Sequence, residues 1–269
     1  MQVGVLNTGI VGPVRLDARW RSTSSLPTPR PTPSGAATYI DRPCLRPRDS
    51  TGANKAFFST RFSRFGAVES GAARVIEIYQ RHALAWSRDR AGRFLERAWC
   101  DRFLALLDDQ HRTVLDIGCG TGRPIAEHLI ENQCQLCGVD SSSTMIEMCV
   151  ERFPDHQWHV ADMRALDLGR TFGGIVAWSS FFHLTPEDQR AMFPVFRRHA
   201  AAGAALIFTT GPSAGQGFGR LQGEPLYTAS LDSTEYRALL NDHGFDVIAH
   251  TAEDPRCGKQ TVWLAQLCQ

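Results

Sequence analysis

The sequence predicts an α/β protein with a doubly wound, seven-stranded, mostly parallel sheet, N-terminal helices and an antiparallel last strand. Two observations predict this fold. Short apolar runs alternate with amphipathic segments from residue 113 to residue 209, as in a chain where strands and helices follow one another. The last two apolar runs, 245–249 and 261–265, have no helix between them, so we expect them to pair antiparallel at one edge.

The individual elements follow from their patterns. Apolar residues recur at helical spacing from Gly71 to Trp86, and again over residues 90–107. Pro186 suits a first helical turn with Thr185 as its N-cap. A glycine-rich stretch at 211–231 is expected to be a long loop, and long loops often cover a site. Strands are expected at 113–117, 135–139, 157–160, 174–178 and 204–209, and helices at 124–131, 143–152, 186–199 and 233–241.

Residues 1–70 differ in composition from the rest of the chain. They carry ten Lys or Arg against four Asp or Glu, a net charge of +6, and a stretch rich in Ser, Thr and Pro. Such a segment buries too little apolar area to offset its chain entropy, so we expect a poorly ordered basic tail. A transit peptide or a start codon assigned too far upstream would look the same. The domain is expected to span residues 71–269.

Composition excludes several classes. The whole chain has a net charge of +1, and no apolar run reaches the ~18 residues of a transmembrane helix, so neither a nucleic acid nor a membrane is expected as a partner. The start has no positive region typical of a secretory signal. Eight cysteines lack a regular framework, and Cys134 and Cys137 have no second pair at zinc spacing. We expect reduced thiols, no metal and a cytoplasmic protein. Nothing indicates its oligomeric state.

The strongest motif joins the first predicted strand to the helix that follows it. It reads Val114-Leu115-Asp116-Ile117-Gly118-Cys119-Gly120-Thr121-Gly122. Glycines let the backbone turn sharply and approach a ligand closely. Dinucleotide enzymes use the spacing G-x-G-x-x-G, but here Arg123 occupies the place of the third glycine. Asp116 would repel a pyrophosphate but can accept hydrogen bonds from an ammonium group or from loop amides.

Three later features occur in the same order as in a known family. Asp140 ends the second strand, 24 residues after Asp116, and a carboxylate there can accept both ribose hydroxyls. Asp162 and Met163 follow the third strand, and Ser179 stands at the tip of the fourth. With the glycine-rich motif, these features make residues 73–267 resemble the class I, Rossmann-like, S-adenosyl-L-methionine-dependent methyltransferases, of the type that acts on small molecules.

The resemblance implies a cofactor site at the strand tips. Asp116 and the loop with Gly118, Cys119, Gly120 and Gly122 would surround the methionine end. Asp140 would hold the ribose, and Asp162 the adenine amino group. In many relatives a preceding helix covers the cofactor with an aromatic residue, for which Tyr79 and Trp86 are candidates, although both also fit a helix face that packs in the core. The remaining implied contacts are Ser141 and Met145 beside the ribose, Met163 beside the adenine ring, and Ser179 at the amino-acid portion.

Methyl transfer needs an aligned nucleophile, exclusion of water and, for some acceptors, a base. His183 is the candidate base, because it follows the fourth strand where the family places acceptor-side residues and titrates near neutrality. A histidine at a helix entrance that only bonds a carbonyl is the alternative. The acceptor pocket is expected to contain four aromatic residues, Phe181, Phe182, Phe218 and Tyr227.

The resemblance implies transfer of a methyl group to an O, or less favourably an N, atom of a small organic acceptor. The tetrapeptide typical of enzymes that methylate nucleic-acid amino groups is missing after the fourth strand. Three alternatives stay open: a nicotinamide-dependent Rossmann oxidoreductase, a catalytically idle methyltransferase-like binding domain, and an RNA methyltransferase with the basic tail as an arm. Removal of residues 1–70 would weaken RNA binding only in the last case.

Overall fold

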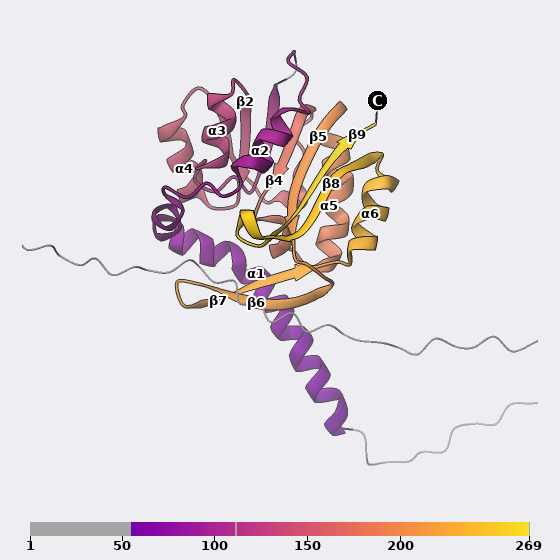
Figure 1. The fold of residues 1–269 in the computed structure, drawn as a ribbon. Coiled ribbons are helices and arrows are strands. Elements are labelled where there is room, and N and C mark those ends of the chain that lie inside the picture. Colours follow the sequence, from indigo (N-terminus) through magenta and orange to yellow (C-terminus); the bar gives the residue numbers. More distant parts are fainter. Residues whose placement is uncertain (1–54, 111, 269) are drawn as a thin grey trace, which may run out of the picture.

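The structure, a computed structural model, describes residues 55–110 and 112–268, with side chains described from residue 71. Its centre is a seven-stranded sheet in the order β3-β2-β1-β4-β5-β9-β8 (Figure 1). Strands β1 to β5 pair parallel where they are neighbours, whereas β9 pairs antiparallel with both β5 and β8. The predicted fold is therefore confirmed. The strands are β1 (Thr113–Ile117), β2 (Gln135–Asp140), β3 (Gln157–Val160), β4 (Phe172–Ala177), β5 (Ala200–Thr210), β8 (Phe245–Asp254) and β9 (Gln260–Leu267).

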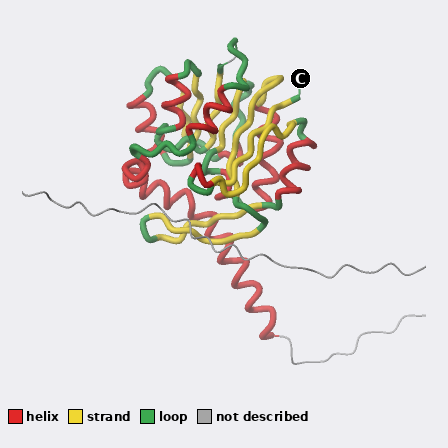
Figure 2. Tube along the Cα trace, viewed as in Figure 1, coloured by secondary structure: helices red, strands yellow, loops and turns green. Residues whose placement is uncertain are grey.

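Helices cover both faces of this sheet (Figure 2). On one face, α2 (Arg97–Leu104) and α3 (Ile125–Glu131) bury an apolar cluster that includes Val114 and Val176, with α4 (Ser143–Arg152) on the same side against β3. On the other face, α5 (Pro186–His199) and α6 (Ser233–Asp242) pack on the larger cluster. Single turns of 3₁₀ helix follow β3 (η1, Met163–Ala165), β4 (η2, Phe181–His183) and β8 (η3, Pro255–Cys257).

Two helices that bear on the site begin as the sequence predicts. Ser142 caps α4, because its hydroxyl oxygen accepts a hydrogen bond from the amide of Met145 at 3.3 Å. Thr185 caps α5 in the same way, with the amide of Asp188 as donor at 3.1 Å. Pro186 occupies the first turn, where it has no intrahelical partner to lose. Both caps fix where the chain leaves the sheet.

The first helix begins earlier than predicted. Helix α1 spans Lys55–Arg90, so it begins before the helix predicted from Gly71 and contains the predicted domain boundary at residue 70. The Pro-rich composition behind that prediction ends at Pro47, and residues 55–70 contain no proline. Residues 1–54 lie outside the described part of the chain. In Figure 1, α1 passes below the sheet and extends beyond the body of the domain.

The segment expected to be a loop at 211–231 is a β-hairpin. Strands β6 (Gly215–Leu221) and β7 (Glu224–Ser230) pair antiparallel and form a separate two-stranded sheet beside α1 (Figure 1). A two-residue turn joins them, with Gln222 and Gly223 at φ angles of 48° and 85°. The glycines of β6 hid the strand pattern. Val75 and Ile78 of α1 pack on Leu221, Leu226, Tyr227 and Ala229 of the hairpin.

Among the described residues, no helix combines the length and the apolar character that crossing a membrane requires. No group of three or more His, Cys, Asp or Glu side chains in residues 71–110 and 112–268 is arranged to hold a metal ion. Cys134 and Cys137 are buried free thiols.

Candidate functional site

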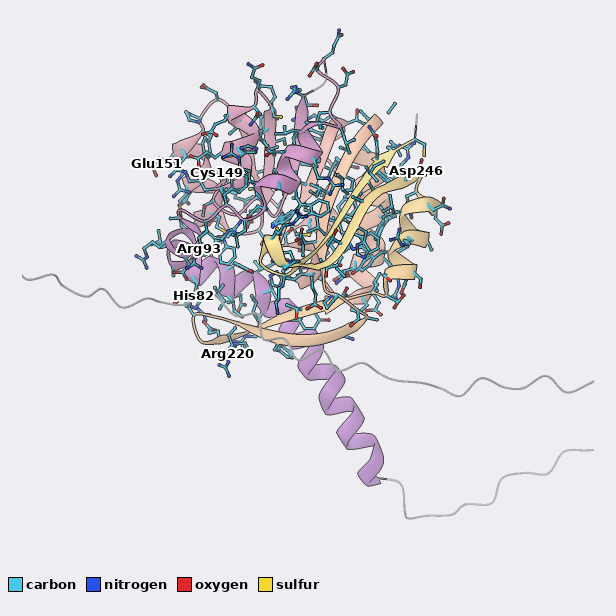
Figure 3. All side chains as sticks on the ribbon, viewed as in Figure 1. His82, Arg93, Cys149, Glu151, Arg220 and Asp246 are labelled. Carbon is cyan, nitrogen blue, oxygen red and sulfur yellow. The ribbon has the colours of Figure 1, made fainter. Side chains whose placement is uncertain are left out.

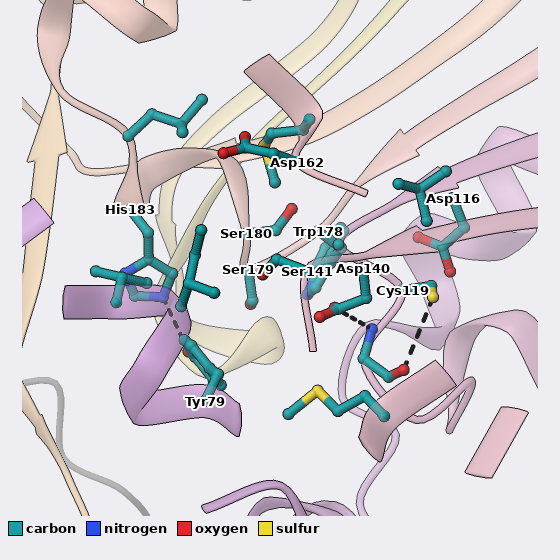
Figure 4. A pocket seen from close by; sticks show the side chains of 18 of the residues that line it. Tyr79, Asp116, Cys119, Asp140, Ser141, Asp162, Trp178, Ser179, Ser180 and His183 are labelled. Atoms are coloured by element: carbon teal, nitrogen blue, oxygen red, sulfur yellow. Dashed lines mark hydrogen bonds between the residues drawn. The ribbon is translucent and has the colours of Figure 1, made fainter. Parts of the chain in front are cut away.

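A cleft of 1120 Å³, part of it open to solvent, lies at the carboxyl ends of the parallel strands, with α1 across it (Figure 4). It is centred where the chain order reverses between β1 and β4, the usual ligand position in open α/β sheets. The sequence predicts fourteen residues that bind the cofactor or act as the base. Thirteen of them line this cleft, and Gly122 does not. The thirteen that do are Tyr79, Trp86, Asp116, Gly118, Cys119, Gly120, Asp140, Ser141, Met145, Asp162, Met163, Ser179 and His183.

The glycine-rich loop is tied to the end of β2. The amide of Gly120 donates to the carboxylate of Asp140 at 2.9 Å, and the amide of Ser142 donates to the other oxygen at 2.9 Å. Gly118 has a φ of +77°, and a Cβ there would lie 2.3 Å from the Cβ of Ser180. Only glycine therefore lets the loop pass this close to the end of β4.

Asp116 and Asp140 place two carboxyl groups in one cleft. Burial, followed by the charge of Asp140, raises the pKa of Asp116 to about 7, and no described residue donates a hydrogen bond to it. Burial also raises the pKa of Asp140, although the amides of Ser142, Gly120 and Ser141 oppose this. The cleft thus offers a carboxyl group whose hydrogen-bonding capacity is free.

Asp162 also lines the cleft, and its carboxylate already has a partner. Its carboxylate accepts from the Arg164 amide at 2.9 Å and from the guanidinium at distances down to 2.5 Å. Burial favours the neutral form, but the bonds from Arg164 lower the pKa of Asp162 below its ordinary value. Arg164 also lies 3.6 Å from Asp188 of α5. The sequence indicated Asp162 but not its partner Arg164.

The tip of β4 has an unusual backbone. Ser179 has a φ of +50°, a conformation rare for a residue with a side chain, and its amide donates to the Thr209 hydroxyl at 2.8 Å. The Ser180 hydroxyl donates to the carbonyl of Ile117 at 2.7 Å. These two bonds hold the end of β4 against β1 and β5, and turn the chain toward His183.

His183 is buried and has a defined partner at each ring nitrogen. Its Nδ1 lies 2.7 Å from the backbone carbonyl of Tyr227 in β7, and its Nε2 lies 2.9 Å from the hydroxyl of Tyr79 in α1 (Figure 4). A carbonyl can only accept, so the ring hydrogen is on Nδ1. Nε2 is therefore the acceptor, and the Tyr79 hydroxyl donates to it. Three elements distant in sequence meet at this ring.

This arrangement keeps both partners neutral. Burial lowers the pKa of His183 to about 4, although the bond to the Tyr227 carbonyl acts in the opposite direction. Burial, and next the charge of Asp140, raise the pKa of Tyr79. Because the hydrogen of the Tyr79 hydroxyl is directed to His183, the lone pairs of the Tyr79 oxygen are the free hydrogen-bonding groups of the pair.

The four aromatic residues expected in an acceptor pocket do not line the cleft. Phe181 is fully buried among the rings of the core, Phe182 is also buried, and Tyr227 is buried under α1, where its backbone carbonyl contacts His183. Phe218 is the cross-strand partner of Tyr227, packs on its ring and lies beside Gly71 of α1. Helical spacing indicated an apolar face in α1 but not its contact with the cleft. The apolar wall beside Tyr79 and His183 consists of Ala72, Val75, Ile76 and Leu184.

These residues fit S-adenosylmethionine. The unpartnered Asp116 suits an ammonium group, and Gly120, Trp86 and Met145 line the same cleft. Asp140 retains lone pairs for ribose hydroxyls. The assignment of individual contacts remains a prediction.

The fold and the cleft define an α/β protein of the doubly wound, nucleotide-binding class. Residues 114–203 match the model of a methyltransferase domain family. The matched segment contains the glycine-rich loop, Asp140 and Asp162, on which the predicted resemblance to class I methyltransferases rests.

Solved structures share this fold. An amino pentose methyltransferase from Micromonospora echinaspora, CalS10, was solved with S-adenosylmethionine bound, and has a TM-score of 0.54 at 18% identity, over 68% of this chain and 95% of that one. The CcbJ methyltransferase from Streptomyces caelestis has a TM-score of 0.53 at 18% identity, over 67% of this chain and 92% of its own.

Similarity to curated proteins is confined to part of the chain. It is 33% identical over 97 residues to a dTDP-3-amino-3,4,6-trideoxy-alpha-D-glucopyranose N,N-dimethyltransferase of Streptomyces venezuelae, covering 35% of this chain and 40% of the relative. It is also 33% identical over 100 residues to trans-aconitate 2-methyltransferase of Azoarcus sp. (strain BH72), covering 36% and 38%. The chain therefore spans about two fifths of the length of these relatives.

Proposed function

We propose that this chain is an S-adenosylmethionine-dependent methyltransferase that methylates an N or O atom of a small organic acceptor, with an amine preferred. The observation that carries the proposal is the neutral Tyr79–His183 pair at the cleft. When bound, S-adenosylmethionine supplies a methyl group on a sulfonium. Asp116, Asp140 and the loop at Gly120 orient the cofactor, and α1 excludes water from the cleft.

Tyr79 would position the acceptor atom. Its oxygen accepts a hydrogen bond from an N–H or O–H of the acceptor, while its own hydrogen stays on Nε2 of His183. That bond turns a lone pair of the acceptor atom toward the methyl group. The proton released can pass to the Tyr79 oxygen as the phenol hydrogen moves to His183.

The low basicity of the pair favours an amine. With a pKa of about 4, His183 is a weak base near neutrality, whereas an efficient base has a pKa near the working pH. A hydroxyl acceptor depends on such a base during transfer, but a neutral amine already carries its nucleophilic lone pair. The N,N-dimethyltransferase named among the relatives supports this preference over the O-methylation expected from the sequence.

Binding and turnover test the proposal separately. Calorimetric titration with S-adenosylmethionine and S-adenosylhomocysteine should show saturable binding, and titration with NADH none. Turnover is then measured by mass spectrometry on matched sugars that differ in one amino or hydroxyl group. Methylation of the amino member supports the proposal, whereas methylation of the hydroxyl member alone reverses the preference. Binding of NADH alone would favour an oxidoreductase, and cofactor binding without any turnover would favour an idle domain.

A further inference from the structure

The tip of the β6–β7 hairpin holds an acidic side chain that is bonded only to α1 among the described residues. Glu224 is the first residue of β7, directly after the tight turn. One carboxylate oxygen lies 2.6 Å from Nη1 of Arg81 and 2.7 Å from Nε2 of His82. The other lies 3.5 Å from Nη2 of Arg74. Three donors from one helix thus meet on a single carboxylate of the hairpin.

The spacing of the donors fixes α1 along its own axis. Arg74 and Arg81 are seven residues apart, which is about 10.5 Å of helix, and both reach Glu224. Ile78 lies between them and is 1% exposed against the hairpin. A shift of α1 in either direction lengthens one of the two arginine contacts. Figure 3 shows His82 on the part of α1 that faces the hairpin carrying Arg220.

The same two elements build the Tyr79–His183 pair. Tyr79 follows Ile78 in α1, and the carbonyl of Tyr227, three residues after Glu224 in β7, holds Nδ1 of His183. Slipping α1 by one residue would move Tyr79 by about 1.5 Å and turn it by about 100°. The hydroxyl would then lose His183. A misplacement of about 1 Å at a reacting centre can cost roughly 10²-fold in rate.

We propose that Glu224 is a positioning residue, which holds α1 in register on the hairpin so that the Tyr79 hydroxyl stays on His183. The inference rests on the proposed function only in taking this pair to serve methyl transfer. Glu224 is not among the residues that line the cleft.

The ion pairs themselves contribute little to stability. The side chains of Arg74 and Arg81 are about half exposed, and exposed pairs are weak and screened by salt. Removal of the Glu224 charge should therefore leave the protein folded while α1 loses its register. Apolar packing of Val75 and Ile78 on the hairpin keeps the helix on the surface when the ion pairs are lost.

The test compares Glu224→Gln with the matched control Glu235→Gln. Glu235 accepts from Nε of Arg190 at 2.6 Å between α5 and α6, away from α1. Arg81→Gln removes the contact from the other side and serves if Glu224→Gln fails to fold. Three readouts are taken on the full chain: hydrogen exchange of residues 71–90, the pH at which the His183 ring titrates by NMR, and affinity for S-adenosylhomocysteine.

With Glu224→Gln we expect faster exchange in α1 and a His183 midpoint raised by about one pH unit or more, because a displaced Tyr79 lets water reach the ring. High salt should move the unmodified protein toward the same values. The control should match the unmodified protein. If Glu224→Gln and Arg81→Gln both match it too, the proposal is overturned. If the unmodified protein binds no S-adenosylhomocysteine, the proposed function fails, while exchange and titration still decide the role of Glu224.

Discussion

Asp116 and Asp140 stand on neighbouring parallel strands and line one cleft, and the pKa of Asp116 rises to about 7 because burial and the charge of Asp140 disfavour its ionised form. In the free protein, protonated Asp116 is therefore populated near neutral pH. A ligand with an ammonium group requires the ionised form. Proton release from Asp116 is thus coupled to binding.

The first prediction is that affinity for S-adenosylhomocysteine rises with pH through about 7. Below that value the free site must lose a proton before binding, which weakens affinity up to about tenfold per pH unit. Above about pH 7 Asp116 is already ionised in the free protein, so its ionisation no longer makes the affinity change with pH. Calorimetry from about pH 5.5 to about pH 8 measures this. Asp116→Asn should bind more weakly and without the dependence, and an unchanged slope in that variant would contradict the assignment.

Asp140→Asn should weaken binding of S-adenosylhomocysteine by roughly 10- to 100-fold. The carboxylate accepts amides from Gly120 and Ser142, and charge-assisted bonds are each worth about 1.5–3 kcal/mol. An asparagine side chain has only one acceptor oxygen, so the amide of Gly120 or that of Ser142 loses its hydrogen bond. Calorimetry gives the affinity, and thermal melting shows whether the fold persists. Affinity equal to that of the unmodified protein would remove Asp140 from the cofactor site.

Tyr79→Phe should lower kcat by about 10²-fold, because the acceptor atom loses the group that positions it, while cofactor affinity changes much less. The substitution removes the hydroxyl that is hydrogen-bonded to Nε2 of His183 and keeps the ring against Trp86. His183→Ala should lower kcat similarly, and the double variant should be no worse than either single one. Steady-state rates on an accepted substrate measure all three. Additive losses would show that the two residues act independently.

Gly118→Ala should destabilise the protein and abolish cofactor binding. Its Cβ would lie 2.3 Å from Ser180, in a backbone with φ of +77°. Gly169→Ala is the matched control, since Gly169 has a φ of +63° but no atom within 4 Å of a Cβ. Both variants carry the backbone strain of about 1–2 kcal/mol, so denaturant unfolding isolates the clash. If both variants lose the same free energy of unfolding, the contact of the new Cβ with Ser180 is relieved at no cost, and the prediction is wrong.

Local patterns predicted most of the sheet. The bounds of α4, α5, β1 and β3 agree with the sequence, because caps, apolar runs and glycines act over a few residues. The cleft residues were predicted for a related reason, since parallel strands bring their carboxyl ends to one edge. Of the residues predicted to bind the cofactor, Gly122 does not line the cleft, and a Cβ placed there would contact Phe153.

The structural features that the sequence did not indicate depend on contacts between segments that are distant in the chain. The hairpin has glycine at alternate positions of β6, so its strand pattern lacks the apolar side chains that mark a strand. Phe181 looked like a pocket residue because it follows a strand tip, but η2 turns its ring into the core. The Tyr79–His183 bond spans 104 residues, and no local signal predicts such a partner.

The carbonyl that holds His183 belongs to the main chain of Tyr227. Every residue type supplies the same carbonyl, so a point mutation at position 227 leaves that acceptor in place. Side chains along the hairpin can therefore diverge between descendants of this protein while the tautomer of His183 is inherited unchanged. Insertions or deletions that shift the pairing of β6 with β7 are the changes that would displace it.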